Sequence, residues 1–223
     1  MLAACSSSDD IAGKVGGVVV GGAEAQSATF KSRALTVAND NLTVLSVDGK
    51  KLALTPPKGA QTRTNDYFVE WRAKGSEGMV SDHMKHSRYG MRAEGGHAYL
   101  FAQGDMTPAS AMPTAATPVR YLGGAMVVQL KGGNDLQGTS EFTVNFAEKK
   151  LDGNLVFNEW TTPVQFANVK IDGNRFKQQQ GGQVIDGAFF GKDAAELAGV
   201  FYKTKDNADT VGDFLGAFGA KKH

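Results

Sequence analysis

One stretch near the C-terminus decides the fold class: Gly187-Ala188-Phe189-Phe190-Gly191-Lys192-Asp193-Ala194-Ala195-Glu196-Leu197-Ala198-Gly199-Val200-Phe201-Tyr202. On both sides of its centre, glycine or apolar residues recur at every second position. A period of two is typical of a strand with one buried face. Glycine inside a strand suits the sharp coiling of a small barrel, and the neighbouring phenylalanines fill its interior. The stretch therefore predicts two barrel strands joined by a short helical turn over residues 193–196.

The same alternation recurs along the rest of the C-terminal half. Strand patterns follow one another at the spacing of about 8–12 residues that antiparallel barrels show. Asp152-Gly153 and Asp172-Gly173 are hairpin turn signals, because glycine readily adopts a positive φ. We therefore predict an eight-stranded antiparallel β-barrel over residues 118–223. Shorter strand patterns and no long helical period precede it, which indicates an all-β chain with an irregular β-rich N-terminal domain over residues 27–117.

The composition excludes several classes of protein. The chain has 24 Lys and Arg against 23 Asp and Glu, a net charge of +1, so it lacks the electrostatic signature of a nucleic-acid-binding protein. No apolar run approaches the ~18 residues of a membrane-spanning helix. Glycine makes up 28 of 223 residues, nearly twice its usual share of about 7%. With only 6 prolines, this excess indicates bends and hairpins of a β-rich fold.

The N-terminus resembles the end of a lipoprotein signal. Leu2-Ala3-Ala4-Cys5 is a small-residue run ending in the chain's one cysteine, followed by serines and aspartates. We interpret Cys5 as a lipidation site, with a stray cysteine at a frayed terminus as the alternative. The following Gly- and Ser-rich residues are typical of a flexible chain. Residues 1–26 are therefore predicted to be a lipobox remnant and flexible tether, with the membrane contacted through the lipid alone.

The C-terminal half resembles the barrel of the transferrin-binding-protein-B-like surface lipoproteins. The resemblance rests on Val169–Phe176, on Gly187–Tyr202 with its pattern G-x-F-[FY]-G-x-x-A-x-E-x-A-G-x-[FY], and on Phe218–Lys222. A weaker match of Ser87–Gly90 and Ala98–Gly104 is similar to the hemophilin and Slam-dependent branch. The resemblance implies a protein on the surface of a bacterial outer membrane, or a secreted one, exported by a Slam-type translocon. It also implies a ligand-binding N-terminal domain.

Histidines in the N-terminal domain are the candidate ligands for a haem iron. The hemophilin resemblance implies haem, and imidazole is the usual proximal ligand of haem iron. The axial candidates are His86, His83 and His97. The apolar and aromatic wall candidates are Tyr89, Met84, Met91, Tyr67 and Trp71. Two observations weigh against this hypothesis: in an extended chain, His83 and His86 point to opposite faces, and solvated histidines in a polar loop would show the same pattern.

Other chemistry is less well supported. A zinc site needs three or four ligands at fixed spacing, and the sequence lacks such a pattern. The methionines form no regular array that would favour copper. The sequence also has no G-x-S-x-G motif, which would indicate a hydrolase. We predict no enzyme and no metal beyond haem iron. The second hypothesis is a surface lipoprotein that binds a host protein such as transferrin or a complement regulator. Tyr67, Trp71 and Tyr121 would form its contact surface if exposed, although buried core is the commoner place for a strand tryptophan.

Overall fold

A computed structural model describes residues 15–23, 32–37, 41–130, 135–160, 163–204 and 211–223. These residues form strands and two short 3-10 turns, which confirms the all-β prediction. The elements are β1 (Val15–Ala23), β2 (Ser32–Val37), β3 (Val44–Val47), β4 (Lys50–Ala53), β5 (Gln61–Thr64), β6 (Phe68–Ala73), β7 (Ser76–Ser81), β8 (Ser87–Glu94), β9 (His97–Gly104), η1 (Ala109–Ala111), β10 (Val119–Gln129), β11 (Asp135–Asn145), β12 (Lys150–Phe157), β13 (Val164–Asp172), β14 (Arg175–Gln180), β15 (Gln183–Phe190), η2 (Lys192–Ala194), β16 (Glu196–Thr204) and β17 (Val211–Lys222).

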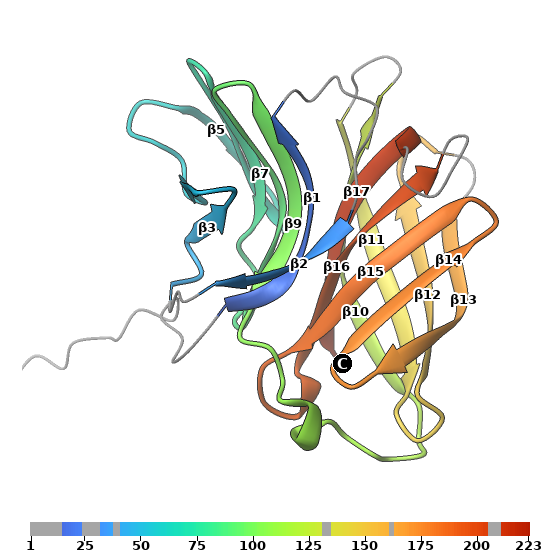
Figure 1. The fold of residues 1–223 in the computed structure, drawn as a ribbon. Helices are drawn as coiled ribbons and strands as arrows, with labels where there is room; N and C mark the ends of the chain where they lie inside the picture. The colour runs from blue at the N-terminus through green and yellow to red at the C-terminus, as the bar shows by residue number, and fades with distance from the viewer. Residues whose placement is uncertain (1–14, 24–31, 38–40, 131–134, 161–162, 205–210) are drawn as a thin grey trace, which may run out of the picture.

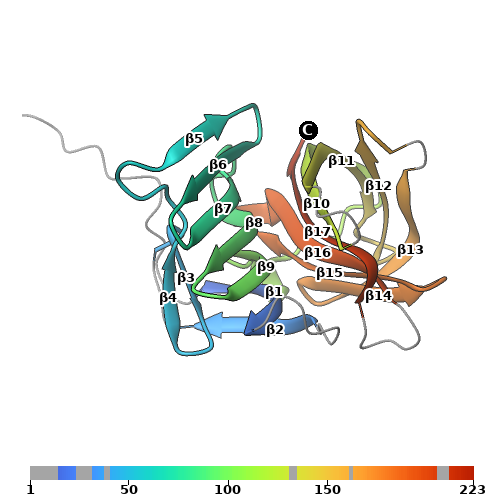
Figure 2. The ribbon, with the colours of Figure 1, turned by 90° about the horizontal axis from the view of Figure 1, so that it is seen from above.

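The N-terminal part is an antiparallel sheet of seven strands. Its order is β2-β1-β9-β8-β7-β6-β5, and the separate hairpin β3–β4 lies against its outer face (Figure 1). Strands β5 to β9 follow one another as simple hairpins, whereas β1 pairs with β9, about eighty residues later. Figure 2 shows the sheet standing beside the barrel, with β5 and β6 at the end away from β2.

The C-terminal part is a closed antiparallel barrel of eight strands, β10 to β17, with β10 paired to β17. Its interior is filled by phenylalanine rings that lie over glycines of the neighbouring strand. Four such pairs are directly opposite in register: Phe142 with Gly153, Phe176 with Gly187, Phe218 with Gly199, and Phe201 with Gly216. A Cβ added at any of these four glycines would lie only 2.4–2.6 Å from the ring. The prediction that glycine makes room for phenylalanine in a barrel is confirmed.

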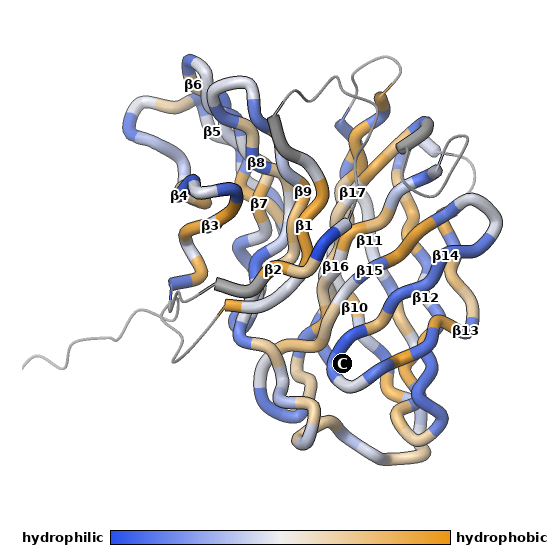
Figure 3. Tube along the Cα trace, in the orientation of Figure 1, coloured by the Kyte–Doolittle hydropathy of each residue, from blue (hydrophilic) through white to orange (hydrophobic). Residues whose placement is uncertain are grey.

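The central strands of the sheet are buried on both faces. One face packs on the outer wall of the barrel, where Val18, Phe68 and Tyr89 meet Val200 and Ala217. The other face packs on the β3–β4 hairpin through a second apolar cluster. Figure 3 shows the apolar residues that follow β1, β9 and β17 where the two parts of the chain meet. Burial of this much apolar surface between the sheet and the barrel makes them one packed unit.

Tyr67, which precedes β6, and Tyr89 of β8 pack on the barrel wall at two glycines, where the wall has no side chains. Gly124 and Gly219 are opposite each other on β10 and β17. The ring of Tyr67 covers Gly124, and the ring of Tyr89 covers Gly219. The Tyr89 hydroxyl donates a 2.9 Å hydrogen bond to the carbonyl oxygen of Gly124. A Cβ at either position would displace a tyrosine ring. This requirement accounts for part of the excess of glycine in the chain.

The prediction of a flexible tether is wrong for residues 15–23, which form the strand β1. Val18 faces the barrel and Val19 faces the β3–β4 hairpin, so this strand is buried on both sides and its apolar residues run together without alternating. The glycines suggested slack, but at Gly21, where φ is +124°, a Cβ would lie 2.1 Å from the Ala98 carbonyl oxygen. They allow close pairing of β1 with β9. Cys5 lies outside the described residues.

One turn prediction also fails. Asp172-Gly173 forms the turn between β13 and β14, with Gly173 at φ +59°. In contrast, Asp152-Gly153 lies inside β12, and Gly153 is the glycine beneath the ring of Phe142. The dipeptide signal was overridden by packing in the barrel. Within the described part of the chain, no helix has the length and apolar character needed to cross a membrane.

Candidate functional site

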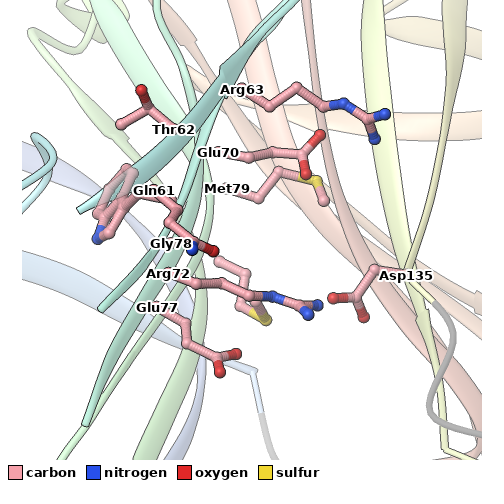
Figure 4. Close-up of a pocket in the computed structure, with 11 residues that line it drawn as sticks. Gln61, Thr62, Arg63, Glu70, Arg72, Glu77, Gly78, Met79 and Asp135 are labelled. Atoms are coloured by element: carbon pink, nitrogen blue, oxygen red, sulfur yellow. The ribbon is translucent and has the colours of Figure 1, made fainter. Parts of the chain in front are cut away.

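A cleft opens between the far end of the sheet and the barrel. Its two adjoining parts have volumes of about 230 and 640 Å³, and Figure 4 shows the smaller one. We call it the inter-domain cleft. The residues that line both parts are Arg63, Glu70, Arg72, Met79 and Asp135.

Strand register places the charged residues of the cleft on one face of the sheet. Arg63 of β5 lies opposite Glu70 of β6, and Glu70 lies opposite Met79 of β7. Directly opposite residues in an antiparallel pair project to the same face. Arg72 is two residues beyond Glu70 and lies opposite Glu77, so both join that face. Positive and negative side chains therefore alternate across β5, β6 and β7.

Methionines and a barrel strand complete the lining. Met79 and Met91 are directly opposite each other on β7 and β8 and form its apolar part. The facing wall comes from the first residues of β11, including Asp135. In Figure 4 the side chain of Arg72 extends from the sheet toward Asp135, whereas that of Arg63 lies beside Glu70.

A hydrogen-bond network joins the two walls of the cleft at one edge. The side-chain amide of Asn65 donates to Gln137 Oε1, and Gln137 Nε2 donates to Glu70 Oε1. Asn65 follows β5, Gln137 belongs to the barrel strand β11, and Glu70 belongs to β6. The network therefore links three elements and holds the sheet at a set distance from the barrel.

The cleft carries more negative than positive groups. Its lining contains two guanidinium groups and four carboxylates, which are Arg63, Arg72, Glu70, Glu77, Asp135 and Glu159. Burial raises the pKa of the Asp135 carboxyl above its ordinary value; Arg72 opposes this rise in pKa, and Glu77 and Glu70 add to it. The surroundings of Asp135 thus disfavour its negative charge, and a further cation in the cleft would stabilise it.

His83 lies in the loop between β7 and β8, next to the barrel strand β17. Its Nδ1 is 3.0 Å from the Tyr67 carbonyl oxygen. Its ring makes edge contacts with the rings of Tyr67 and Tyr89, at centroid distances of 5.1 and 6.0 Å. Its Nε2 is buried, and no residue among those described is within hydrogen-bonding distance of it. Burial lowers the pKa of His83; the Tyr67 carbonyl opposes this, and Lys221 adds to it.

The three predicted axial histidines do not meet at one place. His86 follows His83 in the same loop and packs against Gly191, at the end of β15. His97 begins β9 opposite Glu94, at the other end of β8 from Ser87. With a rise of about 3.3 Å per residue, β8 alone separates them by roughly 20 Å. The chain therefore offers single histidines here and no converging pair that includes His97.

A buried carboxylate holds the loop that carries His83 and His86. Glu196, at the start of β16, accepts hydrogen bonds from the backbone N–H groups of Lys85 and His86 and from the hydroxyl of Ser87. Their lengths are 2.7, 3.0 and 2.8 Å. Because ionised acceptors make stronger hydrogen bonds than neutral ones, this contact anchors the loop to the barrel.

The predicted haem walls are spread over different packed layers. Tyr89 and Met84 are buried between the sheet and the barrel, with Tyr67 and Met91 partly buried beside them. Trp71 is buried on the opposite face of the sheet, against the β3–β4 hairpin. Tyr121, predicted for a host-protein contact surface and not for haem, lies inside the barrel, where its hydroxyl donates to the Ala194 carbonyl oxygen. As described, these side chains do not surround a haem-sized space, and the exposed contact surface predicted from Trp71 and Tyr121 is wrong.

We expect His83 to make the protein less stable in mild acid. Its pKa in the folded state lies below the unfolded value of 6.5. The unfolded chain therefore binds more protons between these two values, and the stability from neutral His83 is lost as pH falls from 6.5 through the folded pKa. Urea unfolding at pH 7.5 and pH 5 measures this loss. A His83→Gln variant should lose less stability between these pH values than the native chain, and an equal loss in both would contradict the prediction.

Sequence reasoning missed the charged residues of the inter-domain cleft. Arg63, Glu70, Arg72 and Glu77 look in sequence like solvated positions of polar strands. The alternation of side chains in consecutive hairpin strands could have placed these four residues on one face. It could not have placed Asp135 near them, because Asp135 lies more than fifty residues further along the chain. Only the packing of sheet on barrel brings it opposite them.

The fold is a closed β-barrel packed against a seven-stranded sheet, with a cleft between them. The chain belongs to the family described as the C-lobe and N-lobe β-barrels of Tf-binding protein B, whose profile matches residues 95–222, more than half of the chain. The predicted resemblance to transferrin-binding-protein-B-like proteins is confirmed, whereas its hemophilin branch stays a prediction. Proteins of this family are binding proteins and not enzymes.

Relatives of known structure share the fold. Transferrin binding protein B from serogroup B Neisseria meningitidis is similar over 94% of this chain and 43% of its own, with a TM-score of 0.68 and 22% identity. A mutant of the Haemophilus parasuis protein is similar over 94% and 45%, with a TM-score of 0.63 and 22% identity. The chain thus spans less than half the length of these structures. An uncharacterized protein of Haemophilus influenzae is 29% identical over 94% of this chain and 75% of its own length.

Proposed function

We propose that the chain is a surface lipoprotein of a bacterial outer membrane that captures a host protein through the inter-domain cleft. Family membership supports a binding role. The anchoring at Cys5 and the export by a Slam-type translocon are carried by the sequence resemblance alone. The single observation that carries the site is the cleft itself, lined from both the sheet and the barrel.

The chemistry of the cleft favours a protein partner. Its charged side chains alternate in sign and most are exposed, as at Arg63, Arg72 and Glu77. Complementary charges at such a surface give a protein complex its specificity and its rate of association. An apolar cofactor would instead need a concave site with mostly hydrophobic walls. The first partner to test is transferrin, because the solved relatives are described as transferrin binding proteins.

The test is direct binding of transferrin to the purified full chain carrying Cys5→Ser. We expect saturable binding with a Kd below about 1 μM. The variant Arg72→Glu should weaken it at least about tenfold, since it reverses a charge inside the cleft. The matched control is Lys150→Glu, at the β11–β12 turn outside the cleft, and it should leave binding unchanged. If no mammalian transferrin binds, other serum proteins are tested. The absence of any specific serum ligand would overturn host-protein capture.

Haem is the second candidate, on the observation that the buried Nε2 of His83 has no hydrogen-bond partner among the described residues. The described packing does not fit haem at this position, because Tyr89 and Met84 are already in contact with the barrel wall. A hemin titration followed by absorption spectroscopy decides the matter. A red-shifted Soret band that is absent in His83→Ala but present in His97→Ala would establish ligation by His83. No spectral change at stoichiometric hemin removes this candidate.

A further inference from the structure

We propose that the inter-domain cleft is a socket for one basic side chain of the partner, an arginine in preference to a lysine. Asp135, Glu70 and Glu77 would supply the negative charge, and Met79 and Met91 would contact the aliphatic stem. This inference deepens the proposed function, because it assigns a chemical class to the group that enters the cleft.

The cleft combines an apolar part with carboxylates around it. The two methionines are directly opposite each other on adjacent strands and present flexible, polarizable side chains to the cleft. The carboxylates lie around them: Glu70 is opposite Met79 on β6, and Asp135 faces them from the barrel (Figure 4). An arginine side chain has this same division, with an apolar stem and a charged head.

The lining of the cleft has an excess of negative groups. Four carboxylates in the cleft face two guanidinium groups. Arg72 extends toward Asp135 from one side, and Gln137 donates to one oxygen of Glu70. Arg63 lies opposite Glu70 and Arg72 lies opposite Glu77, but two guanidinium groups do not balance four carboxylates, so the cleft keeps acceptor capacity for a cation. An arginine suits this arrangement better than a lysine, because its planar fork can bond two carboxylate oxygens at once.

Contacts between the sheet and the barrel hold the two walls of the cleft in place. The Asn65–Gln137–Glu70 network joins the sheet to the barrel at the edge of the cleft. Tyr67 and Tyr89 fix the same region of the sheet in the barrel wall at Gly124 and Gly219. The socket is therefore formed before a partner arrives, and binding does not require its walls to be ordered.

The experiment uses small probes, so that its result does not depend on which host protein is captured. The full chain carrying Cys5→Ser is labelled at the methionine methyl groups, and N-acetyl-arginine amide is titrated while the methyl resonances are recorded by NMR. Met79→Leu and Met91→Leu assign the two signals. We expect saturable shifts at Met79 and Met91 in the millimolar range, since one side chain buries little surface. Met126, buried in the sheet–barrel core, should not move.

Matched variants and probes decide the outcome. Asp135→Asn should weaken binding of the arginine probe about tenfold. Glu148→Gln removes the same charge at the far end of β11 and should leave the affinity unchanged. N-acetyl-glutamate amide should not shift either methyl signal. The proposal is overturned if the arginine probe produces no saturable shift, if the glutamate probe shifts the same signals, or if Asp135→Asn binds as the native chain does. The probe titration and the host-protein binding test are independent measurements, so either proposal can fail while the other is supported.

Discussion

Replacement of Glu196 by alanine is expected to lower the free energy of unfolding by about 3 kcal/mol, because one buried and two partly buried donors lose their acceptor together. Glu196 is only 2% exposed. Its carboxylate accepts hydrogen bonds from the N–H groups of Lys85 and His86 and from the Ser87 hydroxyl. Ser87 is fully buried, so water cannot replace the hydrogen bond that its hydroxyl would lose. The loop between β7 and β8 would then lose its attachment to the barrel.

Three further variants show whether hydrogen bonding is the cause. Glu196→Gln keeps the shape but turns an N–H group toward the donors, so we expect about half the alanine effect. Ser87→Ala removes one donor and should cost about 1 kcal/mol. Glu148→Gln removes an exposed carboxylate and should change stability by less than about 0.5 kcal/mol. Urea unfolding measures all four, with hydrogen exchange at the amides of Lys85 and His86. A loss below about 1 kcal/mol in Glu196→Ala would contradict the prediction.

The second large effect is expected inside the barrel, where Gly216→Ala should cost about 3 kcal/mol. A Cβ at Gly216 would lie 2.2 Å from the Met126 carbonyl oxygen and 2.4 Å from Phe201 Cζ. Gly216 does not have a positive φ, so the cost comes from these contacts and not from backbone strain. The ring of Phe201 can shift, but the carbonyl belongs to the paired strand β10 and cannot move without breaking the ladder.

Gly153→Ala is the informative comparison, because its close contacts are with the Phe142 ring alone. We expect a smaller loss, about 1–2 kcal/mol, since the ring can tilt. Adding Phe142→Leu should recover part of that loss, so that the two substitutions are not additive. Thermal unfolding of the single and double variants tests this. Equal losses at Gly216 and Gly153 would show that the backbone contact is unimportant.

Local sequence patterns predicted part of the fold. Alternation of phenylalanine and glycine indicated the barrel, because cross-strand pairs such as Phe201 with Gly216 leave a period of two in each strand. Local patterns failed where packing overrode them. Asp152-Gly153 resembles a hairpin turn but lies inside β12. The glycines around Val18–Val20 resemble a tether, yet they let β1 approach β9 closely.

The candidate site was less accessible to sequence reasoning. The histidines drew attention because their side chains carry recognisable chemistry, but their sequence proximity does not correspond to proximity in the fold: His83 and His97 lie at opposite ends of β8. The predicted haem walls Tyr89 and Trp71 lie on opposite faces of the sheet. Haem binding stays a prediction that the hemin titration decides.

The sequence by itself determined that this protein is all-β, that its C-terminal half is an eight-stranded barrel, and which family it belongs to. These properties follow from local periodicity and from residues that are close in the chain. Only the tertiary structure decided the place of β1 and the position of the inter-domain cleft. The reason is physical: the cleft exists because Arg72 of the sheet and Asp135 of the barrel are brought face to face. Packing around Tyr67 and Tyr89 creates that arrangement, and no pattern within one strand encodes it.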